Sequence, residues 1–175
     1  MFDWERKKFV RIMGIDPGIE IVGFAILDQC GNNFKPVDYG SIRTESKLST
    51  ATRLKQIYDA CTTLFENYHP EVVAIEKLFF NKNEKTAMIV GQARGVIMLA
   101  AEEAGATITE YTPGQVKMAV VGYGRAEKKQ VQEMVKAILS LPRVPKPDDV
   151  ADALAIAICE AHSSQVARGW RGVLK

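Results

Sequence analysis

Carboxylates at three separate places in this 175-residue chain are the side chains whose types and spacing could support catalysis. Asp16 and Glu76 each follow a run of apolar residues, and a third acidic group comprises Asp148, Asp149 and Asp152. Converging carboxylates, with no His or Cys among them, repel one another unless hard cations join them, and oxygen-only sites select Mg²⁺ or Mn²⁺. Two such ions, about 3.5–4 Å apart, clamp the attacking and leaving oxygens of phosphodiester hydrolysis. The constellation therefore favours a nuclease.

Asp16 is expected at the end of the first strand of a β-hairpin. Residues 10–15 and 21–27 are rich in Val, Ile and Phe, which favour strands, and the Pro17-Gly18 turn signal lies between them. A carboxylate beside the buried residues of a strand needs a partner or a metal. The alternative is that Asp16 only caps the turn by bonding nearby backbone groups.

Glu76 is expected at the end of a second, fully apolar strand over residues 72–75. A helix capped by Ser49 or Thr50 precedes this strand, and an apolar strand after a helix is typical of a parallel position inside a sheet. Ligands of open α/β sheets gather at the carboxyl ends of the strands. Asp16 and Glu76 therefore converge if their strands are neighbours.

The third acidic group is expected at the start of the last helix, residues 149–162. Asp149 and Asp152 are spaced i, i+3, and Asp148 and Asp152 are spaced i, i+4, so each pair shares a helix face. Spacing alone does not choose between Asp148 and Asp149. The alternative role for both is to complement the helix dipole and cap open N–H groups, worth roughly 0.5–2 kcal/mol. Capping explains Asp152 less well, because it lies within an apolar stretch.

The order of elements predicts an α/β domain with a mixed five-stranded sheet flanked by helices. A three-strand meander closes with residues 37–43, and helix, strand, helix and a strand over 107–111 follow. Such an order is similar to the ribonuclease H-like fold. We expect one nuclease domain over 1–175, with a core at about 9–165 and a basic C-terminal tail over 166–175. Residues 163–175 are expected to be poorly ordered.

Composition narrows the class of protein. Apolar residues make up 47% of the chain and charged residues 25%, which is ordinary for a soluble globular protein. No apolar run approaches the ~20 residues of a membrane span, and the first residues lack the pattern of a secretory signal. Three dispersed cysteines favour a reducing, cytoplasmic location. Because the net charge is only +2, affinity for nucleic acid must come from local clusters of basic residues.

The first basic cluster is the loop over residues 77–84, which carries aromatic side chains between lysines. Its candidate DNA-binding residues are Lys77, Lys82, Lys85 and Phe79. Base–aromatic stacking is worth about 1–3 kcal/mol per base, and lysines supply salt-sensitive phosphate contacts. The alternative for an aromatic residue here is that it anchors the loop in the core, which is our expectation for Phe80.

A second basic cluster surrounds Tyr123 and the helix predicted over about 126–139. Its candidate DNA-binding residues are Lys117, Arg125, Lys128 and Lys129, with Lys136 farther along the helix. The alternative is a plain solvated helix face. Phosphate contacts of this kind fix position and not base sequence.

Six short motifs, taken together and in order, resemble the RuvC family of bacterial Holliday-junction resolvases. They are GIDPG at 14–18, AIE at 74–76, GQARG at 91–95, VVG at 120–122, AEK at 126–128 and ADALAIA at 151–157. The resemblance runs from about residue 11 to 165. It implies a homodimeric, metal-dependent endonuclease that nicks two opposing strands of a four-way DNA junction symmetrically. It also implies a partnership with a branch-migration motor of the RuvA and RuvB type.

The resemblance assigns the catalytic, metal-binding carboxylates to Asp16, Glu76, Asp149 and Asp152, and thus selects Asp149 over Asp148. It implies two Mg²⁺ ions per site, for which Mn²⁺ could substitute: Asp16 would contact both ions, Glu76 and Asp149 one each, and Asp152 would complete the site. By the same resemblance Phe79 stacks on unpaired bases at the crossover, and Lys117 and Lys128 contact DNA.

The helix predicted over about 86–104 has a broad apolar face, with Gly91 and Gly95 spaced for close packing. Burial against the sheet and a two-fold dimer contact, which the resemblance implies near this helix, both fit the pattern.

Three other functions compete with the nuclease hypothesis. A sugar kinase or actin-like ATPase needs two such lobes around a nucleotide, and 175 residues supply one. A related ribonuclease-H-like enzyme acting on RNA would lack preference for junctions. A junction-binding protein without catalysis would gain nothing from four carboxylates facing phosphates.

Overall fold

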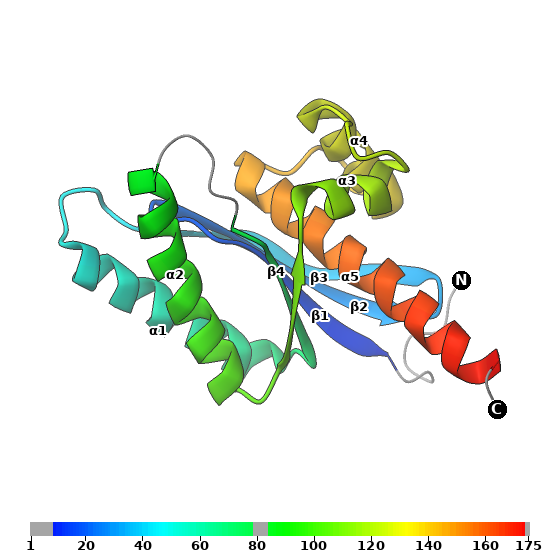
Figure 1. The fold of residues 1–175 in the computed structure, drawn as a ribbon, viewed down its shortest axis with the longest axis horizontal. Helices are drawn as coiled ribbons and strands as arrows, with labels where there is room; N and C mark the ends of the chain where they lie inside the picture. Colours follow the sequence, from blue (N-terminus) through cyan, green and yellow to red (C-terminus); the bar gives the residue numbers. More distant parts are fainter. Residues whose placement is uncertain (1–8, 79–83, 174–175) are drawn as a thin grey trace.

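A mixed sheet forms the centre of the computed structural model, which describes residues 9–78 and 84–173 (Figure 1). Within those residues the sheet has five strands in the order β3-β2-β1-β4-β5. The strands are β1 Val10–Asp16, β2 Ile21–Cys30, β3 Asn33–Arg43, β4 Val72–Glu76 and β5 Thr107–Tyr111. β1, β2 and β3 pair antiparallel, whereas β4 and β5 add parallel to β1. The predicted ribonuclease H-like meander followed by parallel strands is confirmed.

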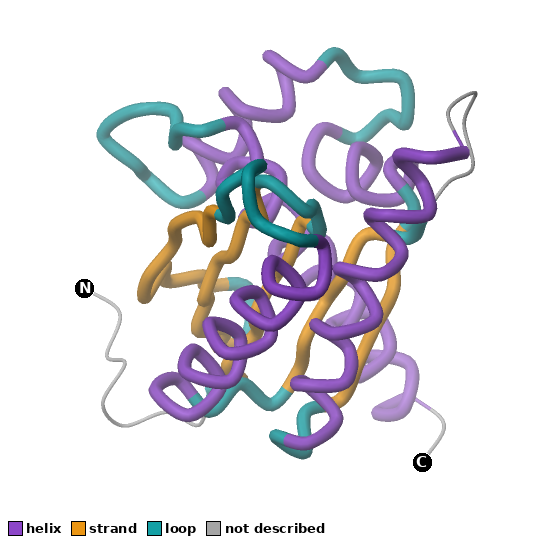
Figure 2. Tube along the Cα trace, turned by 90° about the vertical axis from the view of Figure 1, so that its left-hand side faces the viewer, coloured by secondary structure: helices purple, strands orange, loops and turns teal. Residues whose placement is uncertain are grey.

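Helices cover both faces of the sheet, as Figures 1 and 2 show. On one face lie α1, Thr50–Tyr68, and α2, Glu84–Glu103. On the other lie α3, Pro113–Val121, α4, Lys128–Ile138, and the long α5, Asp148–Val173. Ser49 is the N-cap of α1, because its hydroxyl accepts a hydrogen bond from the backbone N–H of Thr52 at 3.2 Å.

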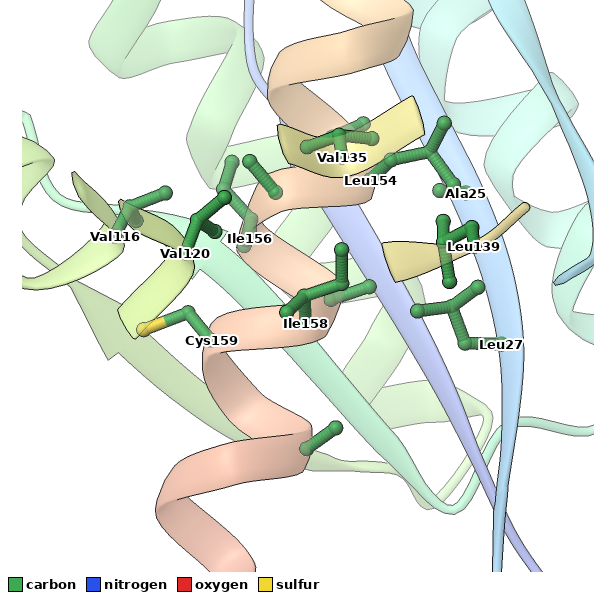
Figure 3. Packing of buried hydrophobic residues seen from close by; sticks show 14 of the residues in the cluster. Ala25, Leu27, Val116, Val120, Val135, Leu139, Leu154, Ile156, Ile158 and Cys159 are labelled. Carbon is green, nitrogen blue, oxygen red and sulfur yellow. The ribbon is translucent and has the colours of Figure 1, made fainter. Parts of the chain in front are cut away.

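Side-chain alternation along the strands divides the core into two parts. Met13 and Ile15 of β1 pack toward α1 and α2, whereas Ile12 packs toward α5. In Figure 3, Leu154, Ile156 and Ile158 of α5 lie among the apolar side chains of β2, α3 and α4. Every second residue of β1, including Asp16, therefore faces α5.

Two element boundaries differ from the predicted ones by more than three residues. β3 begins at Asn33 instead of residue 37, and α5 continues to Val173 instead of ending at His162. Residues 163–173 contain no proline and no strong turn dipeptide, so nothing in their sequence stops the helix. The side chain of Gln29 in β2 also donates a hydrogen bond to the carbonyl oxygen of Ala161 at 2.7 Å, which holds this turn of α5 against the sheet. The expectation of an irregular tail directly after His162 was wrong.

In the part of the chain that the structure describes, none of the helices combines the length and the apolar character needed to cross a membrane.

Candidate active site

Asp16 and Glu76 end two strands that lie side by side. β1 pairs parallel with β4, with Ile15 opposite Ile75, so the last residue of each strand reaches the same edge of the sheet. Ile15 and Ile75 pack toward α1 and α2, whereas Ala74 packs toward α5. Because alternate side chains face opposite sides, Asp16 and Glu76 face α5 together. The predicted convergence of these two strand ends is confirmed.

Two glycines allow α5 to lie against the backbone of the sheet. A Cβ atom at Gly14 would overlap the carbonyl oxygen of Ala153, and a Cβ atom at Gly23 would overlap that of Asp149. Gly23 is also the residue of β2 that pairs with Asp16. The first turns of α5 therefore rest directly on β1 and β2, which brings Asp149 and its neighbours to the strand ends.

The charges of these side chains interact strongly. The pKa of Asp16 is raised to about 8, first by burial and then by the negative charges of Asp152, Glu76 and Asp149. Burial, followed by the charge of Asp152, raises the pKa of Glu76. Burial also raises the pKa of Asp152, although Lys128 opposes this shift. Four carboxylates thus lie within reach of one another's fields, in a setting that disfavours leaving all of them charged without a cation.

Lys128, at the start of α4, supplies positive charge to the outer side of this group. Its Nζ lies 2.9 Å from Oδ2 of Asp152 and 3.5 Å from Oδ2 of Asp148. With the side chains in these positions, no three acidic, His or Cys residues among those described enclose a ready-made metal position. The donor set still fits hard cations: it is all oxygen, and no hydrogen-bond donor of the described residues reaches the carboxylates of Asp16 and Glu76.

The structure separates the two acidic residues that spacing could not. Asp148 lies at the rim, where Lys146 Nζ donates to its Oδ1 at 2.6 Å; this hydrogen bond is the main cause that lowers the pKa of Asp148. Asp149 lies against Gly23 and acts electrostatically on both Asp16 and Asp152. The inner group therefore consists of Asp16, Glu76, Asp149 and Asp152.

A cleft of about 210 Å³ opens beside the inner carboxylates. Glu76 and Asp152 line it together with Lys117 and Lys128, and Val116 and Val131 form part of its wall. A second cleft of about 210 Å³ lies on the other side of Glu76, with Arg94 in its lining. A larger cleft of about 510 Å³, between the C-terminal ends of α1 and α2, contains none of the predicted site residues.

The predicted DNA-binding residues fall into two groups. Lys77, Lys117 and Lys128 are exposed or half-exposed and line the clefts, whereas Arg125 and Lys129 are exposed near the start of α4. Lys85 is in the first turn of α2, but its side chain is outside the described part, and Phe79, Phe80 and Lys82 lie outside the described residues. We predicted a DNA contact for Lys128, and the structure adds its contacts with Asp152 and Asp148.

Sequence reasoning missed two residues that shape the site. Gly23 carried no turn signal, although a glycine inside a strand often marks a close approach of another backbone. Arg94 appeared only as part of the GQARG motif; its Nε donates to the carbonyl oxygen of Glu76 at 3.2 Å. Its partners are distant in the sequence, so periodicity could not identify them.

Comparison with known proteins shows the family of the chain. Residues 12–160 match the family described as "Crossover junction endodeoxyribonuclease RuvC". The chain is 62% identical over 153 residues to the crossover junction endodeoxyribonuclease RuvC of Brevibacillus brevis, covering 87% of this chain and 92% of that protein. The corresponding protein of Halothermothrix orenii is 57% identical over 159 residues, covering 91% of this chain and 96% of that protein.

Among solved structures, similarity extends to "T. thermophilus RuvC in complex with Holliday junction substrate". The TM-score is 0.82 at 32% identity, and the match covers 90% of this chain and 96% of that one.

Proposed function

The chain belongs to the RuvC family of crossover junction endodeoxyribonucleases, and from this membership we propose how it resolves Holliday junctions in DNA recombination and repair. Two opposing strands of the four-way junction are nicked symmetrically at a site formed by Asp16, Glu76, Asp149 and Asp152. The observation that carries the proposal is the convergence of these four carboxylates, at the ends of β1 and β4 and the start of α5.

The four inner carboxylates are proposed to hold two divalent cations, Mg²⁺ with Mn²⁺ as a substitute. When bound, such ions stabilise charge on the attacking and leaving oxygens of phosphodiester hydrolysis. Asp16, whose pKa is raised by burial and by the charges of the other three, would contact both ions. Glu76 and Asp149 would hold one each, and Asp152 would complete the site. Hard cations would relieve the repulsion that raises the pKa of Asp16.

The DNA is proposed to approach over the two clefts beside Glu76. Lys117 lines one of them, and its positive charge, after that of Lys128, offsets part of the rise in the pKa of Glu76. Lys77 lines the other cleft, and Arg125 and Lys129 are exposed near the start of α4. Phosphate contacts by these side chains would place the backbone of the junction beside the carboxylates. Phe79, Lys82 and Lys85 remain predicted contacts.

A homodimer is proposed to form through α2. Met88, Gln92, Gly95 and Leu99 share one face of the helix, and Met88 and Leu99 are 67% and 53% exposed. A Cβ atom at Gly95 would meet no described atom within 4 Å, so the close packing predicted for this glycine is absent within the described chain. An exposed apolar face with a small residue at its centre suits contact between two copies, which would present two sites to opposing strands.

Family membership further supports a cytoplasmic location and a branch-migration motor of the RuvA and RuvB type as partner. The three thiols, Cys30, Cys61 and Cys159, are all free, which suits a reducing compartment. Neither the motor contact nor the location depends on the carboxylate geometry.

The test is cleavage of a labelled synthetic four-way junction, with Mg²⁺ and with EDTA, beside a linear duplex of the same sequence. We expect paired symmetric nicks in the junction alone, and only with the metal. Binding without cleavage would instead indicate a junction-binding protein, and equal attack on both substrates a general nuclease.

A further inference from the structure

Arg94 of α2 reaches the carboxylate-bearing end of β4 from the opposite face of the sheet. Its Nε donates to the carbonyl oxygen of Glu76 at 3.2 Å, and its terminal nitrogen forms an ion pair with Glu110 of β5. The side chain is only 17% exposed. One guanidinium group thus ties α2 to the ends of two neighbouring strands.

The backbone of Glu76 is held at few other points beyond the strand. Glu76 pairs with Tyr111 in the β4–β5 ladder, and the N–H of Lys77 donates to the carbonyl oxygen of Tyr111 at 2.8 Å. After Leu78 the chain leaves the described residues. The last peptide group of the strand is therefore held at its N–H by Tyr111 and at its carbonyl oxygen by Arg94, and the bond from Arg94 restrains the backbone from which the Glu76 side chain projects.

We propose that Arg94 is a positioning residue for Glu76. It sets the orientation of the Glu76 carboxylate toward the inner group, while Glu110 holds the guanidinium in place. The proposal rests on the proposed function, in which Glu76 binds a divalent cation. Residues that orient a metal ligand from outside the ligand set commonly change metal affinity or activity by about 10–100-fold.

A direct phosphate contact is the competing role for an arginine near a nucleic-acid cleft. Arg94 is poorly placed for it, because most of its side chain is buried and Glu110 neutralises its charge. The two roles differ in the affinity they control. A positioning residue affects the response to metal, whereas a phosphate contact affects junction binding and its dependence on salt.

The experiment compares Arg94→Lys and Arg94→Ala with the wild-type protein. Lys keeps the charge but cannot bond both partners in the fork geometry of arginine. Two readouts are measured: the Mg²⁺ concentration that gives half of the metal-induced rise in the thermal unfolding midpoint, and junction affinity in EDTA. We expect Arg94→Lys to raise that Mg²⁺ concentration about tenfold, with junction affinity unchanged within about twofold.

Two matched variants separate this effect from general loosening. Arg53→Lys changes an arginine of α1 whose Nε donates to Thr44 Oγ1 at 2.8 Å on the same face of the molecule, and it should leave the metal response unchanged. Glu110→Gln keeps the bond from Arg94 to Glu76 and should have a smaller effect than Arg94→Lys.

The outcomes are distinct. An Arg94→Lys protein with the wild-type metal response, or with weakened junction binding and a normal metal response, overturns the role of Arg94 alone. A wild-type protein that shows neither a metal-induced rise in its unfolding midpoint nor junction cleavage overturns the proposed function, and the Arg94 proposal with it. If Arg94→Ala does not fold, Arg94→Lys still decides the question.

Discussion

Acidic residues occur at two places along α5, and their surroundings differ. In the middle of the helix, Glu160 is 4% exposed, and its Oε2 accepts hydrogen bonds from the hydroxyls of Tyr111 at 2.6 Å and Thr109 at 2.8 Å. At the start of the helix, Asp149 and Asp152 lie beside Asp16, which is surrounded by negative charge. The carboxylate of Glu160 is surrounded by neutral hydroxyl donors, whereas the nearest charges around Asp16 are mainly those of other carboxylates.

We interpret this difference as that between a structural carboxylate and the proposed metal-binding group. Hydroxyl donors from β5 satisfy Glu160 without any ligand, so its role is to fasten α5 to the sheet. The same helix then carries Asp149 and Asp152 to the ends of β1 and β4, where Lys128 donates to Asp152 but no donor of the described residues reaches Asp16 or Glu76. A helix that is fixed at one point can hold a repulsive cluster of charges at another, as the proposed metal site requires.

The strongest test of this difference is to make the same carboxylate-to-amide change in the proposed metal-binding group and at Glu160. Asp16→Asn should reduce junction cleavage by at least about a thousandfold, equivalent to about 4 kcal/mol of transition-state stabilisation, because it removes a proposed metal ligand. Junction affinity in EDTA should stay within a fewfold of wild type. Glu160→Gln, also a carboxylate-to-amide change, should keep most of the cleavage rate. Normal cleavage by the Asp16→Asn protein would refute the assignment of the site.

The pH dependence of stability provides the second test. Asp16 has a pKa of about 8 in the metal-free fold, against an ordinary 3.8. Between these values the folded state binds more protons than the unfolded state, so this group's contribution to stability is full below about pH 4 and is lost as pH rises toward 8.

Asp16→Asn should therefore match the stability of the metal-free wild type near pH 4 and exceed it by about 3–5 kcal/mol near pH 9, at about 1.4 kcal/mol per pKa unit. Urea unfolding in EDTA across this pH range measures the difference. Mg²⁺ should reduce it, since a cation that binds the folded wild type stabilises that state. A difference independent of pH would show that Asp16 is charged throughout.

Removing the structural carboxylate should affect stability and not metal binding. Glu160→Ala leaves the hydroxyls of Tyr111 and Thr109 without their acceptor and opens a small void, for an expected loss of about 2–4 kcal/mol in the free energy of unfolding. Glu160→Gln keeps one acceptor oxygen and should lose less. Urea unfolding at pH 7 measures both, and Mg²⁺ titration of the unfolding midpoint provides the control. A smaller loss for Ala than for Gln would contradict the role assigned to these hydrogen bonds.

The sequence was sufficient to predict where the carboxylates converge, but not how they are supported. Asp16 and Glu76 could be placed together because each ends an apolar strand and parallel neighbours share an edge. The partners of Glu160 and Arg94 could not be predicted, because they lie on β5 and at the end of β4. Contacts between segments that are distant in the sequence do not produce a periodic pattern of residues. The end of α5 was missed for a different reason: residues 163–173 contain no signal that stops a helix, but a basic segment near the C-terminus was expected to be poorly ordered.

The choice between Asp148 and Asp149 also depends on a contact between distant segments, which the sequence does not predict. Both share a helix face with Asp152, and only the contact of the α5 backbone with Gly23 places Asp149 inward. Asp148 is left at the rim with Lys146 and Lys128, and its side chain is 43% exposed.

Asp148→Asn should therefore be the mildest of these changes. Exposed ion pairs contribute roughly 0–1 kcal/mol, so we expect a loss of stability of less than about 1 kcal/mol and a cleavage rate within about threefold of wild type. Asp149→Asn, one residue farther along the helix, should lose cleavage as severely as Asp16→Asn. Both are measured in the same junction-cleavage and urea-unfolding assays. Because the two substitutions are chemically identical and adjacent, a reversed order of effects would mean that α5 is rotated by about one residue, roughly 100°, relative to the sheet, and would assign the metal to the rim.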